Sequence, residues 1–128
     1  MKKFLAALFS GILVTGFFAA PAQAREIERQ GTCSQGSFWE ASVELEYSVH
    51  DLDFDIDTRV ANQTWTLTLT HNKKKVRTQA RTAIKDYDDS YAEVEWDFIR
   101  RNQRGADTFT FRAVNDTTGE ICRVTIKN

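Results

Sequence analysis

The stretch that most constrains the fold of this chain is 63–72, Q-T-W-T-L-T-L-T-H-N, because apolar and polar side chains alternate in it without interruption. Trp65, Leu67 and Leu69 fall on one side of an extended chain, and a row of threonines falls on the other. Alternation with a period of two, rich in β-branched residues, is typical of a β-strand with one buried face. The stretch therefore predicts a central strand of an all-β domain.

Most of the remaining chain repeats this pattern, and Gly, Asn, Asp and Lys mark the connections. The alternation changes phase after His50, and a slip of one residue exchanges the two faces of a strand. We therefore expect a turn or bulge near His50 and Asp51. By contrast, 25–32 is polar and has no period, which predicts a loose N-terminus. The predicted strands are about 37–48, 52–58, the strand around Trp65, 76–84, 92–98, 108–113 and 122–126.

These segments predict a seven-stranded, immunoglobulin-like (Greek-key) β-sandwich, since the chain holds seven short strands and neither a convincing helix nor a repeat. A closed barrel is the alternative fold. The core is expected to contain the tryptophans and phenylalanines that are in phase with the apolar positions: Trp39, Trp65, Trp96, Phe54, Phe98, Phe109 and Phe111.

The first 24 residues have the pattern of a cleaved signal peptide. Lys2 and Lys3 precede an apolar run of about 17 residues, and small residues end the segment at Ala24. An uncleaved anchor is the rival interpretation, although the run is short for a membrane span. We predict cleavage after Ala24, an N-terminal segment 25–36, a sandwich domain 37–128, and an extracellular or periplasmic location without a membrane anchor.

Cys33 and Cys122 are the two cysteines of the chain. In an exported protein such a pair predicts a disulfide. A zinc or redox site is the alternative, but there is no C-x-x-C motif, and His50 and His71 are the only histidines. Without the signal peptide the chain has 15 Lys and Arg against 18 Asp and Glu, a net charge of about −3, which argues against nucleic-acid binding.

Three motifs carry a resemblance to a family. C-S-Q-G-S-F-W (33–39), N-Q-T-W-T-L-T-L-T-H-N (62–72) and A-V-N-D-T-T-G-E-I-C (113–122) resemble a group of small, secreted, uncharacterised bacterial proteins. This chain departs from the pattern at Asn62 and Lys73, where Gly is usual or frequent, and its middle is more charged. The resemblance implies an exported immunoglobulin-like or fibronectin-III-like sandwich and no activity.

If the first, second and fifth predicted strands share a sheet, charge separates between the two outer faces of the sandwich. One face is expected to be acidic, and the other basic and rich in threonine, which would steer a charged partner or stack copies of the chain. The alternative interpretation is that solvent-exposed faces of strands are commonly charged, so the separation of charge has no binding role. We predict a non-catalytic interaction module whose partner, an unidentified protein or envelope polymer, is acidic and contacts Lys75, Arg77, Arg81, Arg100, Arg101 and Arg104.

Two alternative functions remain open. Carbohydrate or envelope-polymer binding would require an exposed aromatic side chain such as Tyr87, Tyr91 or Trp39. A calcium-dependent structural or adhesion role would use the acidic face together with the loop 86–89. No nucleophile motif, metal-ligand set or cofactor motif is apparent, so we predict no enzyme activity and no cofactor. Partner identity and oligomeric state do not follow from the sequence.

Overall fold

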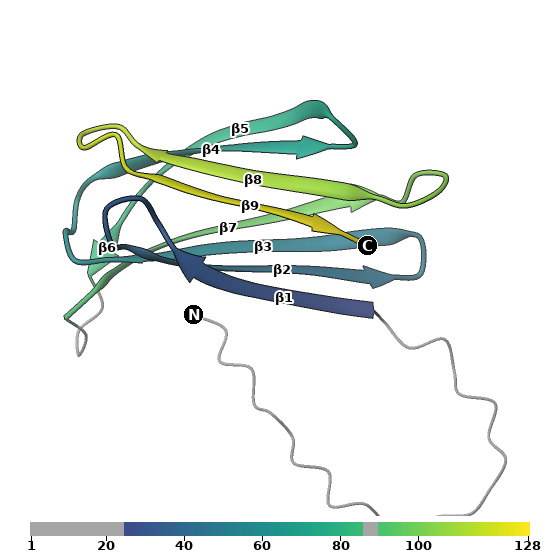
Figure 1. Ribbon diagram of the computed structural model, residues 1–128, viewed down its shortest axis with the longest axis horizontal. Helices are drawn as coiled ribbons and strands as arrows, with labels where there is room; N and C mark the ends of the chain where they lie inside the picture. The colour runs from purple at the N-terminus through teal and green to yellow at the C-terminus, as the bar shows by residue number, and fades with distance from the viewer. Residues whose placement is uncertain (1–24, 86–89) are drawn as a thin grey trace, which may run out of the picture.

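The computed structural model describes residues 25–85 and 90–128, and these residues form nine strands in two antiparallel sheets (Figure 1). Sheet A has the order β1 (Arg25–Thr32), β2 (Phe38–Glu46), β3 (Val49–Thr58), β7 (Ala92–Arg101) and β6 (Ile84–Lys85). Sheet B has the order β5 (Lys74–Thr82), β4 (Thr64–His71), β8 (Thr108–Asn115) and β9 (Ile121–Lys127). The described part of the chain contains no helix that is long and apolar enough to cross a membrane.

The connections between the strands confirm the predicted Greek-key sandwich. Hairpins join β2 to β3, β4 to β5 and β8 to β9, while the chain changes sheet after β3, after β5 and after β7. The predicted grouping of the first, second and fifth strands is also correct, because β2, β3 and β7 are neighbours in sheet A. The described residues contain two strands beyond the predicted seven, β1 and β6. The predicted signal peptide lies outside the described residues.

The prediction of a loose N-terminus at 25–32 is wrong. All eight residues of β1 pair with β2, from Arg25 opposite Leu45 to Thr32 opposite Phe38. Only Ile27 packs against the core from this edge strand, so it carries no apolar alternation for sequence analysis to detect. Backbone hydrogen bonds to β2 order the segment instead.

The phase change near His50 arises at a turn three residues earlier than predicted. Tyr47 and Ser48 form a two-residue turn between Glu46 and Val49, and Tyr47 has a positive φ of 56°. Because the turn precedes Val49, the inward-facing residues of β3 begin at His50. His50 is therefore fully buried, whereas Tyr47 is 94% exposed.

Aromatic side chains fill the space between the sheets, as predicted. Trp65 and Trp96 are fully buried, and the rings of Phe54 and Phe111 stack across the two sheets at 5.2 Å. The Trp96 indole donates a hydrogen bond to the backbone oxygen of Gln79 at 3.1 Å, which ties sheet A to the edge strand β5. Trp39 is half-buried and stacks on Phe54.

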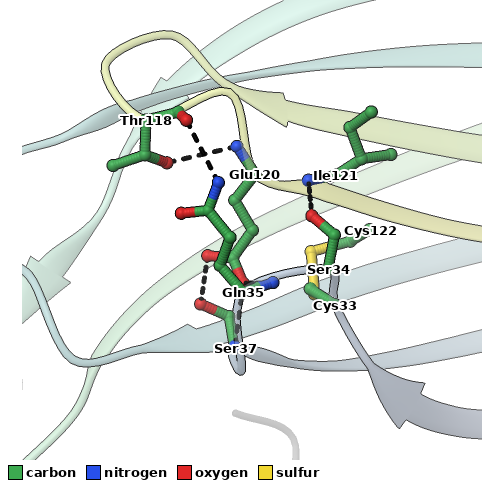
Figure 2. The surroundings of a disulfide bond; sticks show 8 residues. All are labelled: Cys33, Ser34, Gln35, Ser37, Thr118, Glu120, Ile121 and Cys122. Carbon is green, nitrogen blue, oxygen red and sulfur yellow. Dashed lines mark hydrogen bonds between the residues drawn. A yellow bond between two sulfur atoms is a disulfide. The ribbon is translucent and has the colours of Figure 1, made fainter.

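One end of the sandwich is closed by the predicted disulfide between Cys33, in the β1–β2 connection, and Cys122, in β9 (Figure 2). Beside it, the buried Glu120 carboxylate accepts hydrogen bonds from the backbone nitrogens of Gln35 and Ser37, both at 2.9 Å. It also accepts a bond of 2.7 Å from the Ser37 hydroxyl. The bridge joins residues 89 apart, which is worth about 4–5 kcal/mol in the chain-entropy model.

Candidate functional site: the acidic face of sheet A

The outer face of sheet A carries rows of carboxylates that run across its strands. In one row Glu40, Asp55 and Glu95 lie opposite one another on β2, β3 and β7. Directly paired residues of antiparallel strands share a face, with their Cβ atoms about 4.5–5.5 Å apart. We call this surface the acidic face, and define it by Glu26, Glu28, Glu40, Glu44, Glu46, Asp51, Asp53, Asp55, Asp57, Glu93, Glu95 and Asp97.

The acidic face is hollowed rather than flat. A groove with a volume of about 330 Å³ lies over β1, β2, β3 and β7, and Asp53, Asp55, Glu95 and Asp97 are among its lining residues. Its floor includes the buried Ser42, whose hydroxyl donates to the Asp53 carboxylate at 3.4 Å. A side chain that enters the groove would therefore meet carboxylates contributed by several strands.

Asp55, Glu93 and Glu95 form the most crowded part of the acidic face, with one carboxylate oxygen of each within 4.8 Å of the others. Burial, together with the negative charges of Glu95 and Glu93, raises the pKa of Asp55 to about 7. Burial and a hydrogen bond with Glu95 raise the pKa of Glu93 to about 7 as well, and the same bond lowers the pKa of Glu95. Gathering these carboxylates thus has an electrostatic cost, which a bound cation would offset.

Exposed apolar side chains lie on the same outer face at both ends of the acidic rows. Phe38, opposite Asp57, is 48% exposed, and Ile99, opposite Asp51, is 73% exposed. Asp51 and Asp57 are six residues apart on β3, which corresponds to about 20 Å along an extended strand. Exposed apolar side chains therefore lie beside carboxylates near both ends of the acidic face.

The basic residues predicted to bind a partner are not gathered into one patch. Lys75 lies opposite Thr70, on the outer side of sheet B. Arg77 and Arg81 lie opposite Leu69 and Trp65, which places both on the inward side of β5 at the open edge of the sandwich. Their predicted position on the outer face is therefore wrong, because a bulge between Leu69 and Thr70 shifts the register of the β4–β5 pair. The Arg77 guanidinium lies 5.8 Å from the centroid of the Phe98 ring, a cation–π contact.

The other three predicted basic residues lie at the opposite end from the disulfide. Arg100 is half-buried and donates a hydrogen bond to His71. Arg101 is exposed at the end of β7, and Arg104 is exposed in the β7–β8 connection. A binding role for the six residues stays a prediction.

The outer face of sheet B is rich in threonine, as predicted. Thr68, Arg112 and Arg123 form one row across β4, β8 and β9, and the hydroxyls of Thr110 and Thr125 are hydrogen-bonded at 2.9 Å in the next. The two outer faces of the sandwich therefore differ in charge, as the sequence predicted.

Two of the three aromatic residues predicted to bind carbohydrate are among the described residues, and both have little exposed surface. Tyr91 and Trp39 are half-buried, while Tyr87 and the acidic loop 86–89 lie outside the described residues. Phe38, which sequence analysis did not single out, is more exposed than either and touches the edge of the Tyr91 ring.

Sequence analysis also missed a buried polar network that contains both histidines. His50 is in phase with Leu52 and Phe54, and His71 with Leu67 and Leu69, so both point into the sandwich. This phase was the available signal. For His71 it follows from the alternation of 63–72, whereas for His50 it depends on placing the β2–β3 turn at Tyr47 and Ser48.

Comparison with protein-family models, curated proteins and solved structures found no match to this chain. The conclusion about its class accordingly rests on the molecule itself, which is an all-β, two-sheet sandwich with one disulfide.

Proposed function

We propose that this protein is a secreted, non-catalytic interaction module that binds a cationic partner through the acidic face of sheet A. The observation that carries the proposal is the set of carboxylate rows across β1, β2, β3 and β7, with a groove along them. The raised pKa values of Asp55 and Glu93 support it, because they mark negative charge that a positive partner would stabilise.

The proposed partner has the opposite sign to the one expected from the sequence. The six basic residues predicted from the sequence are dispersed over the β5 edge, the outer face of sheet B and the end of β7 with the connection after it. The carboxylates, by contrast, are continuous over four strands of sheet A. A continuous field of one sign accelerates the encounter with an oppositely charged molecule and selects against like-charged ones. The apolar side chains at both ends of the rows favour a partner that has apolar residues beside its positive charges.

Export is part of the proposal. The signal-peptide pattern of 1–24 and the disulfide are both compatible with an oxidising compartment. The resemblance of three sequence motifs to small secreted bacterial proteins points the same way. A basic protein or peptide outside the cytoplasmic membrane is therefore the expected kind of partner.

The experiment is a binding titration of the purified, disulfide-bonded protein with a decalysine peptide and, separately, with a decaglutamate peptide. Decalysine should bind, and its affinity should fall at least tenfold between 20 and 200 mM NaCl because salt screens exposed charges over about 10 Å. The variant D53N/D55N/E95Q should abolish binding. The control R112Q/R123Q, which changes two charges on the outer face of sheet B, should retain it. Binding of decaglutamate instead would overturn the proposal and favour the basic residues.

Calcium is the rival occupant of the same face, since the oxygens of Asp55, Glu93 and Glu95 converge. A melting temperature that rises in 1 mM CaCl₂, together with no binding of decalysine in the absence of calcium, would identify a cation site rather than a peptide site. Replacing Phe38 with Ala should leave the affinity for decalysine within about threefold of wild type, because the proposed binding depends on the carboxylates.

A further inference from the structure

The end of the sandwich opposite the disulfide holds a buried polar network formed by three strands and one connection. His50 lies at the start of β3, His71 at the end of β4, Arg100 near the end of β7, and Asp107 directly before β8, so all four come together where these elements meet (Figure 1). His50 is 0% exposed, and His71 and Asp107 are each 1% exposed. We call these four residues the histidine network.

The hydrogen bonds of the network fix where its protons lie. Arg100 Nε donates to His71 Nδ1 at 3.4 Å, and His71 Nε2 lies 2.6 Å from Asp107 Oδ1. Because a guanidinium only donates, Nδ1 of His71 must accept, so the proton of the neutral ring is on Nε2 and is donated to Asp107. A second proton on His71 would set an N–H group against the Arg100 N–H and break that contact.

His50 is the unsatisfied member of the network. Neither of its ring nitrogens has a hydrogen-bond partner, and Nε2 lies 3.8 Å from Asp107 Oδ2. Its ring packs edge-on against Phe109 at 4.9 Å. Burial lowers the pKa of His50, while the Asp107 carboxylate partly opposes that effect and His71 adds to it. The imidazole is therefore held neutral in the folded protein at neutral pH.

Charged groups on two neighbouring strands make the network intolerant of added protons, while the other two cross-strand neighbours, Leu45 on β2 and Phe109 on β8, are uncharged. Arg100 on β7 is the cross-strand neighbour of His50, and Lys74 on β5 is that of His71. Among the described residues, Asp107 is the acidic group paired with the two rings, and it already accepts from His71 and from the backbone nitrogen of Gln103. Each further proton would leave the buried network with net positive charge.

Two histidines and an aspartate are also a familiar donor set for metals, but Arg100 argues against that use. A metal on His71 Nε2 would need the proton moved to Nδ1, where the Arg100 N–H already points. The network is thus better suited to gain or lose protons than to coordinate a cation.

We propose that the histidine network is an acid-sensitive latch that holds the 102–107 connection and the C-terminus closed when both histidines are neutral. Asp107 links these parts, since its backbone exchanges two hydrogen bonds with Asn128, at 2.8 and 3.0 Å. Its carboxylate also accepts from Gln103, whose side chain in turn accepts from Asn72 at 2.9 Å. Protonation of the histidines separates His71 from Arg100, and the connection then opens without unfolding of the disulfide end.

Amide hydrogen exchange of the full, oxidised protein at pH 7.5 and 5.0, corrected for the intrinsic effect of pH, tests the latch. Amides of residues 102–107 and Asn128 should lose at least tenfold protection at pH 5.0, while the 115–121 turn beside the disulfide should not change. The variant H71Q, whose amide can still donate to Asp107 and accept from Arg100 but cannot take up a proton, should lose most of the effect. H50F, which removes the other buried proton acceptor, should lose part of it. Equal protection at both pH values in the wild type would overturn the proposal.

If H50F or H71Q fails to fold, an NMR titration of the histidines in the wild-type protein still tests the latch. The latch requires a His50 signal that titrates below 6.5 and broadens or shifts together with the amides of 102–107. Two histidines that titrate independently, near 6.5 and without effect on those amides, would contradict the latch.

Discussion

Replacing Asp55 with Asn should stabilise the protein at pH 8 and stabilise it much less at pH 5. Burial and the neighbouring Glu95 and Glu93 raise the Asp55 pKa from 3.8 to about 7, a difference of about 3 pH units. At about 1.4 kcal/mol per unit, the ionised carboxylate destabilises the folded state by at most about 4 kcal/mol. Asp55 is partly exposed, so solvent screening reduces this to about 1–2 kcal/mol.

The sign of the effect follows from proton uptake. Between about pH 4 and 7 the folded state binds more protons at Asp55 than the unfolded chain does, so this residue favours folding as pH falls towards 4. Above pH 7 the folded state carries the full repulsion. An Asn side chain resembles the protonated acid, so D55N removes the full repulsion at pH 8. At pH 5 it gives a smaller gain, because there only the unfolded chain is ionised at Asp55.

Urea unfolding of the disulfide-bonded protein, followed by tryptophan fluorescence, measures both values. The matched control is Asp51→Asn on the same strand and face. Asp51 has one cross-strand carboxylate, Glu44, and lies opposite Ile99 on β7, whereas Asp55 lies between two carboxylates, Glu40 and Glu95. D51N should change the free energy of unfolding by less than about 0.5 kcal/mol at either pH, as surface substitutions usually do. If D55N destabilises the protein at pH 8, or stabilises it equally at pH 5, the reasoning about the acidic face is refuted.

Three further changes test the fold, each by the urea midpoint. Glu120→Gln should cost about 1–3 kcal/mol, because an amide cannot accept all three hydrogen bonds of the carboxylate; Glu28→Gln on the exposed β1 is the control. Gly31→Ala should cost about 1–3 kcal/mol, since a Cβ there would lie 2.5 Å from the Trp39 ring, and Thr32→Ala should be nearly neutral. Reduction of the disulfide should cost about 4–5 kcal/mol. An unchanged midpoint would contradict, respectively, the carboxylate clamp, the close contact of β1 with the indole, and the entropic role of the bridge.

The parts of the fold that were predicted correctly from the sequence are those that the order of side chains within one short segment, or the residue types present, determine. The alternation around Trp65 identifies β4 and its buried face, and the single pair of cysteines leaves one intramolecular bridge to form. The acidic face followed from the same alternation, because the outward positions of β2, β3 and β7 are consistently Asp or Glu.

The parts that sequence did not predict depend on backbone pairing. β1 is held by hydrogen bonds to β2 and has one half-buried apolar residue, so its side chains give no signal. The bulge after Leu69 turns Arg77 and Arg81 to the other side of β5, and bulges leave little trace in composition. The placement of His50 in the core depended on locating a turn at Tyr47, a residue type that turns do not favour.

The most direct test of the proposed function is to locate bound decalysine on the protein by amide chemical-shift changes at low salt. The proposal predicts that the changes concentrate on β2, β3 and β7, centred on the row of Glu40, Asp55 and Glu95, and that 300 mM NaCl removes them. Changes centred on β5 or on the 102–107 connection, or no changes at any peptide concentration, would contradict it.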